Sequence, residues 1–108
     1  MLPEFSITVR NLPDTHVVML HGELDVLSAD GLENSLVELA GSTLVADLSD
    51  LVFMDSSGMG ALVRARNRIK ADGLGDLVLT RPSPIVQKAL EIVGLSASIV
   101  DWSPDWTE

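Results

Sequence analysis

Residues 45–62 have the sequence Val-Ala-Asp-Leu-Ser-Asp-Leu-Val-Phe-Met-Asp-Ser-Ser-Gly-Met-Gly-Ala-Leu. The stretch begins with aliphatic residues typical of a strand, passes through a polar connection from Ser49 to Asp55, and takes helical spacing from Ser57 onward. Open α/β sheets place their functional residues at such strand-to-helix turns. This stretch therefore predicts an α/β protein and locates a candidate site within it.

The flanking sequence continues the alternation of strands and helices. We expect strands at residues 5–10, 16–21, 43–48, 76–80 and 98–102. We expect a first helix that starts near Ser28, ends at Gly41 and buries Leu32, Leu36, Leu39 and Ala40. A second helix should start near Ser57, end at Gly73 and bury Met59, Leu62, Val63 and Ile69. A third should start at Ser83–Pro84, end at Gly94 and bury Val86, Leu90 and Val93. This order predicts a mixed, mostly parallel sheet whose antiparallel pairing is the leading hairpin. Leu36, Val45, Leu62, Leu79 and Leu90 should lie in the core.

Length and composition indicate one small domain. The chain has 108 residues, of which 46% are hydrophobic and 4% aromatic, so an aliphatic core can form. We expect a single domain over residues 1–108, with residues 103–108 as a loose acidic tail. The absence of cysteine excludes disulfides and thiolate metal sites, and it fits a reducing compartment.

Charge narrows the classes of partner. The formal net charge is −9, from 16 acidic and 7 basic residues, so the surface should repel nucleic acids and anionic membranes. No apolar run is long enough to span a bilayer, and we expect a cytoplasmic protein. Four of the basic residues, Arg64, Arg66, Arg68 and Lys70, lie in one segment, which we interpret as a solvated helix face rather than a docking patch.

The two adjacent serines of the central stretch have two interpretations. Ser56 or Ser57 could be the N-cap of the second helix, because a serine hydroxyl accepts a hydrogen bond from a free helix amide. Capping needs only one of them, however. A second hydroxyl, the preceding Asp55 and the small residues Gly58 and Gly60 favour an exposed, approachable hydroxyl.

Catalytic patterns fail at this position. The hydrolase elbow requires glycine two residues before the nucleophile, where Met54 and Asp55 stand instead, and a phosphate-binding loop would need a lysine after Gly60. We expect structural or surface roles for His16 and His21. A receiver domain phosphorylated on Asp47 would need clustered acids and a late lysine. We therefore predict a protein that is not an enzyme and that uses no metal or cofactor.

The central stretch resembles a known family. Four segments are similar to the anti-sigma factor antagonists, which have the STAS fold. They are Gly22-Glu23-Leu24-Asp25, Ser28-Ala29, Val45-Ala46-Asp47-Leu48-Ser49 and Phe53-Met54-Asp55-Ser56-Ser57-Gly58-Met59-Gly60. The resemblance implies a sheet of four to five strands with about three helices packed mainly on one face. Many members carry a final helix, for which residues 101–108, with Pro104, are too short.

The resemblance also implies a function. Ser56 would accept phosphate, with Ser57 as second choice. The unmodified protein would bind an anti-sigma factor that is also an ATP-dependent serine kinase and so release a sigma factor; phosphorylation would end this binding, and a metal-dependent phosphatase would reverse it. The implied partner-binding residues are Asp25, Asp55, Ser56, Ser57, Gly58, Met59 and Gly60.

Two alternatives remain open on the sequence. The chain could be a STAS subunit or scaffold of another complex, in transport or stress signalling. A small serine hydrolase is the third reading, despite the missing catalytic pattern.

Overall fold

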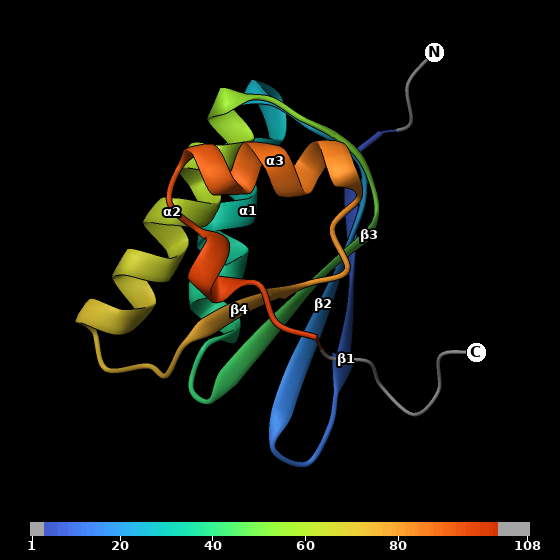
Figure 1. The fold of residues 1–108 in the computed structure, drawn as a ribbon. Helices are drawn as coiled ribbons and strands as arrows, with labels where there is room; N and C mark the ends of the chain where they lie inside the picture. Colours follow the sequence, from blue (N-terminus) through green and yellow to red (C-terminus); the bar gives the residue numbers. More distant parts are fainter. Residues whose placement is uncertain (1–3, 102–108) are drawn as a thin grey trace.

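The structure, a computed structural model, describes residues 4–101. In chain order the elements are β1 (Ser6–Asn11), β2 (Thr15–Leu24), α1 (Val26–Leu39), β3 (Thr43–Met54), α2 (Ser56–Ala71), β4 (Leu77–Thr80), α3 (Pro84–Ile92) and a short 3₁₀ turn at Ser96–Ser98. Figure 1 shows α1 and α2 side by side against the strands, with α3 crossing near their ends. The expected alternation of strands and helices is thus present. The predicted acidic tail, residues 103–108, lies outside the described residues, as does Pro104.

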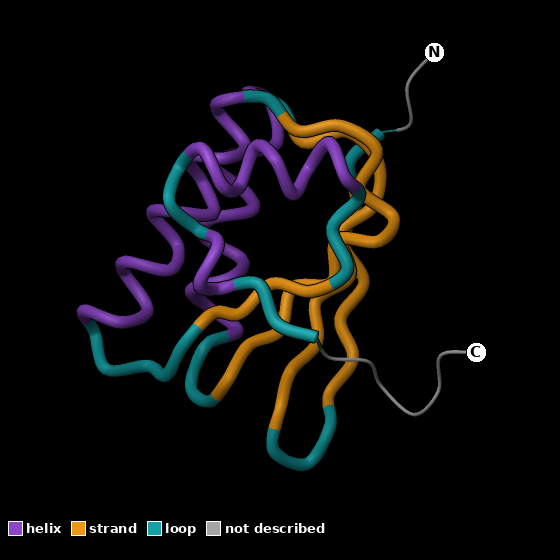
Figure 2. The backbone as a smooth tube through the Cα atoms, in the orientation of Figure 1, coloured by secondary structure: helices purple, strands orange, loops and turns teal. Residues whose placement is uncertain are grey.

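Within residues 4–101 the sheet is mixed and contains four strands in the order β1-β2-β3-β4. β1 pairs antiparallel with β2, whereas the β2–β3 and β3–β4 pairs are parallel. Figure 2 shows the strands in orange, with the helices in purple gathered to one side of them. The first two strands are joined by a tight turn in which the Leu12 amide donates to the Thr15 carbonyl at 2.8 Å. The prediction of a mostly parallel sheet of four to five strands with one leading hairpin is confirmed.

Two strands are longer than predicted. β2 continues past Gly22 to Leu24, and β3 continues through the expected polar connection to Met54. Their pairing shifts register between Met19 and His21 and again after Gly22, whose φ of 84° lies in the left-handed region. Such irregularities let a strand bend without leaving the sheet. Polar residues occur where the pairing shifts, so composition alone predicted turns at positions where the two strands in fact continue.

The predicted strand over residues 98–102 is wrong for the part that the structure describes. Ser96–Ser98 forms a 3₁₀ turn, and Ile99 makes an isolated bridge to Leu79. The Val100 amide then donates to the Leu79 carbonyl at 2.8 Å. The segment touches β4 without running along it, and Trp102 lies outside the described residues.

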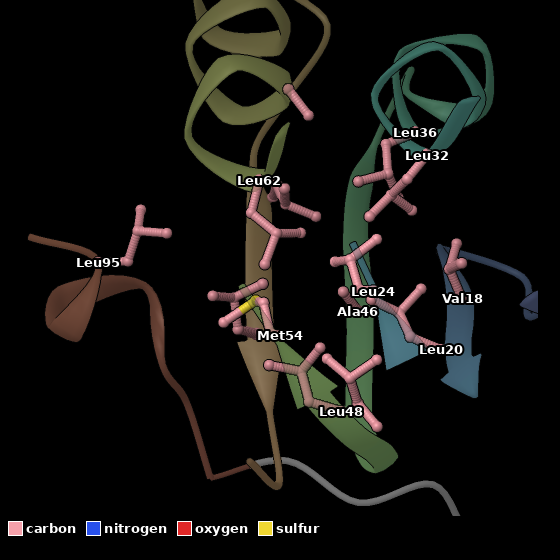
Figure 3. Packing of buried hydrophobic residues seen from close by; sticks show 14 of the residues in the cluster. Val18, Leu20, Leu24, Leu32, Leu36, Ala46, Leu48, Met54, Leu62 and Leu95 are labelled. Carbon is pink, nitrogen blue, oxygen red and sulfur yellow. The ribbon is translucent and has the colours of Figure 1, made fainter. Parts of the chain in front are cut away.

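One apolar core joins the sheet to all three helices. Figure 3 shows Val18, Leu20 and Leu48 from the strands packed toward Leu36 and Leu62 from the helices. Leu44 of β3 and Leu90 of α3 belong to the same cluster. All five predicted core residues are buried. Val45 alone belongs elsewhere, because alternation along the strand puts it beside Val17 on the sheet's other face. The helices therefore cover mainly one face, as expected.

Two apolar positions are more exposed than their patterns predicted. Val9 lies on β1, at the edge of the sheet, and Val93 is the C-cap of α3 rather than part of its buried stripe. The last turn of a helix faces less of the core than its middle does. The 3.6-residue pattern therefore predicts more burial there than the structure shows.

The helix ends follow the predicted glycines. Gly73 and Gly94 have φ of 67° and 81°, and the Leu74 and Leu95 amides donate back to Ile69 and Leu90, each at 2.9 Å. These bonds are those of a Schellman end. α3 also begins as predicted, with Ser83 as N-cap and Pro84 in the first turn.

Candidate functional site

Two helices begin side by side at the carboxyl end of the sheet. Leu24 of β2 pairs with Met54 of β3, and each strand leads directly into a helix, α1 or α2. The Asp55 amide donates to the Leu24 carbonyl at 3.2 Å, which joins the two strand ends. The next residues, Asp25 and Asp55, are the N-caps of the two helices. Asp25 and the serine motif therefore lie side by side.

The N-cap of each of these two helices is an aspartate rather than Ser28, Ser56 or Ser57, so capping, one of the two interpretations of the paired serines, does not apply. Asp25 accepts from the Leu27 amide at 3.0 Å, and Ser28 completes a capping box from inside the helix. Asp55 accepts from the Gly58 amide at 3.0 Å. A carboxylate is at least as good a cap as a hydroxyl, and its charge also suits the positive end of the helix dipole.

This capping leaves the serine hydroxyls for other uses. Ser56 and Ser57 are the first two residues of α2; Ser56 is exposed and Ser57 is half-buried. Because Asp55 satisfies the Gly58 amide, neither hydroxyl is the cap of the helix. Exposure favours Ser56 over Ser57 as the residue that a modifying enzyme could reach.

Gly58 has a different role from the one that the sequence suggested. It is buried, and a Cβ built on it would lie 2.7 Å from Leu24 Cγ and 2.9 Å from Met54 Cγ. The first turn of α2 therefore packs directly on the ends of β2 and β3. At Gly60 a Cβ would meet the mobile end of Arg64, at 2.9 Å. Gly58 thus fixes the position of the helix start rather than uncovering a hydroxyl.

Carboxylates crowd around the two helix starts. Partial desolvation together with the neighbouring Asp25 and Asp55 raises the pKa of Glu23 above its usual range. The three acids come from two strand ends, and no basic residue contributes to this shift. Glu23 was not predicted as a site residue from the sequence. Its position two residues before Asp25 was the signal that could have indicated it. A further negative group here would meet an already unfavourable potential.

The seven predicted partner-binding residues all lie at these two helix starts, but they differ in accessibility. Ser56 is exposed, and Asp25, Asp55 and Ser57 are half-buried. Gly58 is buried, and Met59 packs against the core. The surface of the candidate site is therefore made by the aspartates and serines, while Gly58 and Met59 support it from beneath.

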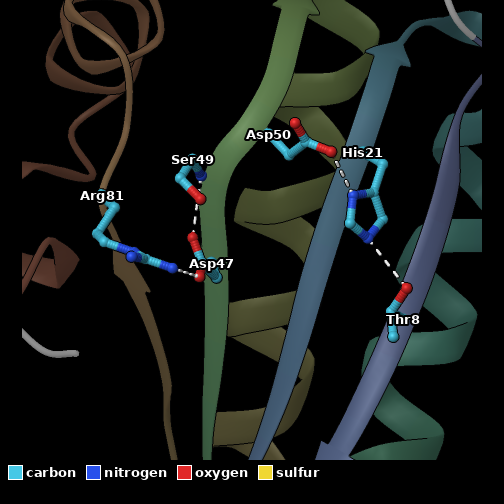
Figure 4. Close-up of polar contacts among 6 residues, drawn as sticks. All are labelled: Thr8, His21, Asp47, Ser49, Asp50 and Arg81. Atoms are coloured by element: carbon cyan, nitrogen blue, oxygen red, sulfur yellow. Dashed lines mark hydrogen bonds and ion pairs between the residues drawn. The ribbon is translucent and has the colours of Figure 1, made fainter. Parts of the chain in front are cut away.

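Both histidines lie on β2 with hydrogen-bonding neighbours. His21 Nδ1 lies 2.6 Å from Asp50 Oδ2 and its Nε2 lies 3.0 Å from Thr8 Oγ1 (Figure 4). His16 Nδ1 lies 2.5 Å from Asn11 Oδ1. Thr8 and Asp50 are exposed, and none of these residues lines the groove of about 300 Å³ between β1 and α1. The arrangement links β1, β2 and β3 through the side chains of Thr8, His21 and Asp50.

Asp47 is a structural group. It is 2% exposed in the middle of β3, where it forms an ion pair with Arg81 and accepts from the Ser49 amide at 3.0 Å (Figure 4). Desolvation raises its pKa, but the hydrogen bonds from Arg81 and Ser49 outweigh this and lower the pKa overall. Arg81 reaches it from a left-handed backbone, with φ of 55°. A buried, paired carboxylate is unsuited to accept phosphate, and residues 4–101 contain no cluster of acids or histidines that could hold a metal.

The basic segment of α2 is engaged with neighbouring acids. Arg64 and Arg68 contact Glu33 of α1 at 2.7 and 3.0 Å, while Arg66 and Lys70 face Asp76 at 3.6 and 3.8 Å. The hydrogen bond from Arg64 and the contact with Arg68 lower the pKa of Glu33 despite its partial burial. These pairs tie α2 to α1 and to the start of β4, which fits the predicted helix face better than a docking patch.

Comparison with known proteins agrees with this fold. The STAS domain family model matches residues 6–107. The chain is 39% identical over 100 residues to the anti-sigma-B factor antagonist of Bacillus subtilis, covering 91% of this chain and 90% of that protein. It is 33% identical over 99 residues to the anti-sigma F factor antagonist of Lysinibacillus sphaericus, covering 88% and 80%.

A solved structure shows the same architecture. The anti-sigma factor antagonist SpoIIAA in its unphosphorylated form superposes with a TM-score of 0.77 and 25% identity, covering 93% of this chain and 90% of that one. The chain belongs to the STAS domain family and, within it, to the anti-sigma factor antagonists.

Proposed function

We propose that this protein is an anti-sigma factor antagonist whose unmodified form binds an anti-sigma factor with serine kinase activity and thereby releases a sigma factor. Phosphorylation of Ser56 ends the binding, and a metal-dependent phosphatase restores it. The names of the two antagonist relatives support the first part. The observation that carries the switch is the exposed Ser56 at the start of α2, beside Asp55 and the carboxylates of the β2 end.

Charge explains how a single phosphate would act. It adds about −1.5 to −2 charges at pH 7, and at a helix start it meets the positive end of the dipole, so the fold tolerates it. At the docking surface the same charge joins Glu23, Asp25 and Asp55. A hundredfold loss of affinity corresponds to about 2.7 kcal/mol, which one unfavourable charge contact at an interface can supply.

In this proposal the protein contributes no catalysis. The kinase transfers phosphate from ATP to the Ser56 hydroxyl, and the phosphatase hydrolyses the phosphoserine with water. The chain works in the cytoplasm with protein partners, without a cofactor, nucleic acid or membrane. Among residues 4–101 no helix is both long enough and apolar enough to cross a bilayer.

Phosphorylation is tested with the anti-sigma factor kinases encoded in the same genome, each purified and incubated with the protein and ATP. We expect one phosphate on Ser56 by peptide mass spectrometry, none on Ser56→Ala, and unchanged labelling of Ser57→Ala. Calorimetric titration should show that enzymatic phosphorylation weakens binding roughly a hundredfold. Modification of Ser57 alone would refute the assignment, and equal affinities of both forms would end the switch hypothesis.

A further inference from the structure

Two large apolar side chains are exposed in the first turn of α1. Val26 is 67% exposed and Leu27 is 91% exposed, although the helix buries Ala29, Leu32 and Leu36 on its other side. Scattered apolar residues on a surface are ordinary. Two adjacent ones at a helix start are less so, because this turn otherwise favours polar and acidic residues. We call Val26 and Leu27 the α1 apolar pair.

The α1 apolar pair lies at the same end of the sheet as Ser56. It follows Asp25 directly, and Leu24 is joined to Asp55 by the strand-end hydrogen bond of 3.2 Å. Phe53, 42% exposed, pairs in register with Glu23 at this end. Exposed apolar groups and carboxylates are therefore interleaved around the two helix starts.

We propose that the α1 apolar pair is the hydrophobic anchor through which this protein docks its partner, with Leu27 as the central contact. The proposal rests on the proposed function and names the chemistry of the partner: an anti-sigma factor kinase whose docking surface has an apolar pocket bordered by lysine or arginine. Charge complementarity selects this occupant. Asp25 directly precedes the pair, and Glu23 and Asp55 lie at the same strand ends close enough to raise the pKa of Glu23, so an acidic partner or a second copy of this chain, with a net charge of −9, is repelled.

This division of roles follows the usual anatomy of interfaces. A few buried apolar residues at the centre supply most of the binding energy, and a polar rim sets orientation and partner choice. Leu27 supplies the centre, whereas the carboxylates supply the rim on which a phosphate at Ser56 would act. The anchor at Leu27 and the phosphorylation site at Ser56 are thus neighbouring but separate. A substitution at one should leave the contribution of the other to binding unchanged.

The experiment compares Leu27→Ser, Val26→Ser and Ile92→Ser in calorimetric titrations against the purified anti-sigma factor kinase that binds the wild-type protein. Ile92 is the matched control, because it is 78% exposed but is the last residue of α3 rather than part of either helix start. We expect Leu27→Ser to weaken binding roughly ten- to hundredfold, Val26→Ser less, and Ile92→Ser not at all. Leu27→Met should retain most of the affinity, and the melting temperatures should stay close to that of the wild type.

The outcomes separate the anchor from the proposed function. If the wild type binds and Leu27→Ser binds equally well, the anchor is refuted while the antagonist function stands. A wild-type protein that binds none of the organism's anti-sigma factor kinases overturns both. Raising the salt concentration should weaken wild-type and Leu27→Ser binding by the same factor, because the carboxylate rim is intact in each. A salt response confined to the wild type would also contradict the separation of anchor and rim.

Discussion

The middle of β3 and its carboxyl end use the same residue type in opposite ways. In the middle, Asp47 is buried and paired with Arg81, and its pKa is lowered. At the end, Asp55 caps a helix next to Glu23 and Asp25, and the pKa of Glu23 is raised. A carboxylate with a cationic partner strengthens the fold, whereas carboxylates grouped without one are available for an outside partner. The structural role of Asp47 and the exposed role of the carboxylates at the strand end therefore follow from their neighbours and not from the residue type.

The largest effect should come from breaking the buried pair. Removing one partner of a buried ion pair costs about 3–5 kcal/mol, and since Arg81 is partly exposed we expect Asp47→Asn to lose about 2–3 kcal/mol in urea unfolding at pH 7. The exposed Asp50, paired with His21, is the control, and Asp50→Asn should cost about 1 kcal/mol or less.

The pH dependence of this loss has a defined sign. Because the folded-state pKa of Asp47 lies below its ordinary value of 3.8, the stabilisation is present above pH 3.8 and disappears as the pH falls below it. The gap between the wild type and Asp47→Asn should therefore close under acid conditions. A gap that stayed constant down to the acid transition would show that Asp47 acts through packing rather than charge.

An intermediate effect is expected at Gly58, which tests whether the exposed end is as closely packed as the middle. A methyl group there overlaps Leu24 and Met54, so Gly58→Ala should cost about 1–3 kcal/mol in spite of its better helix propensity. Gly31→Ala in α1 is the matched control: nothing lies within 4 Å of its Cβ, and it should gain up to about 1 kcal/mol. If both variants were stabilised, α2 would not be fixed by close packing on the strand ends.

The smallest effect should come from relieving the crowded carboxylates. The raised folded-state pKa of Glu23 means that its ionised form is disfavoured by the fold, so stability is lost as the pH rises through that pKa. Glu23→Gln should slightly raise the melting temperature at pH 7, and the gain should vanish below its ordinary pKa of 4.5. This sign is opposite to that of Asp47→Asn. A lower melting temperature at pH 7 would indicate that Glu23 has a stabilising partner.

The candidate site was only partly predictable from the sequence. The pattern indicated the strand-to-helix turn, and the resemblance indicated Ser56. The sequence left the capping residue of α2 open, because Asp, Ser and Asn are nearly equivalent caps and adjacent candidates cannot be told apart by spacing. Val26 and Leu27 were not recognised at all, since apolar residues near a helix start are equally compatible with a buried stripe. Only the orientation of α1 shows that they face outward.

The sequence by itself determined the order of the elements through α3, the single hairpin, the glycine helix ends and most of the apolar stripes, because each depends on residues close together in the chain. Tertiary structure decided the features that depend on contacts between residues distant in the chain. The pairing of Leu24 with Met54 brings Glu23, Asp25 and Asp55 together, and Arg81 reaches Asp47 across 34 positions. Burial and charge pairing depend on these distant contacts, so the pKa directions and the exposure of Ser56 and Leu27 follow from the folded arrangement.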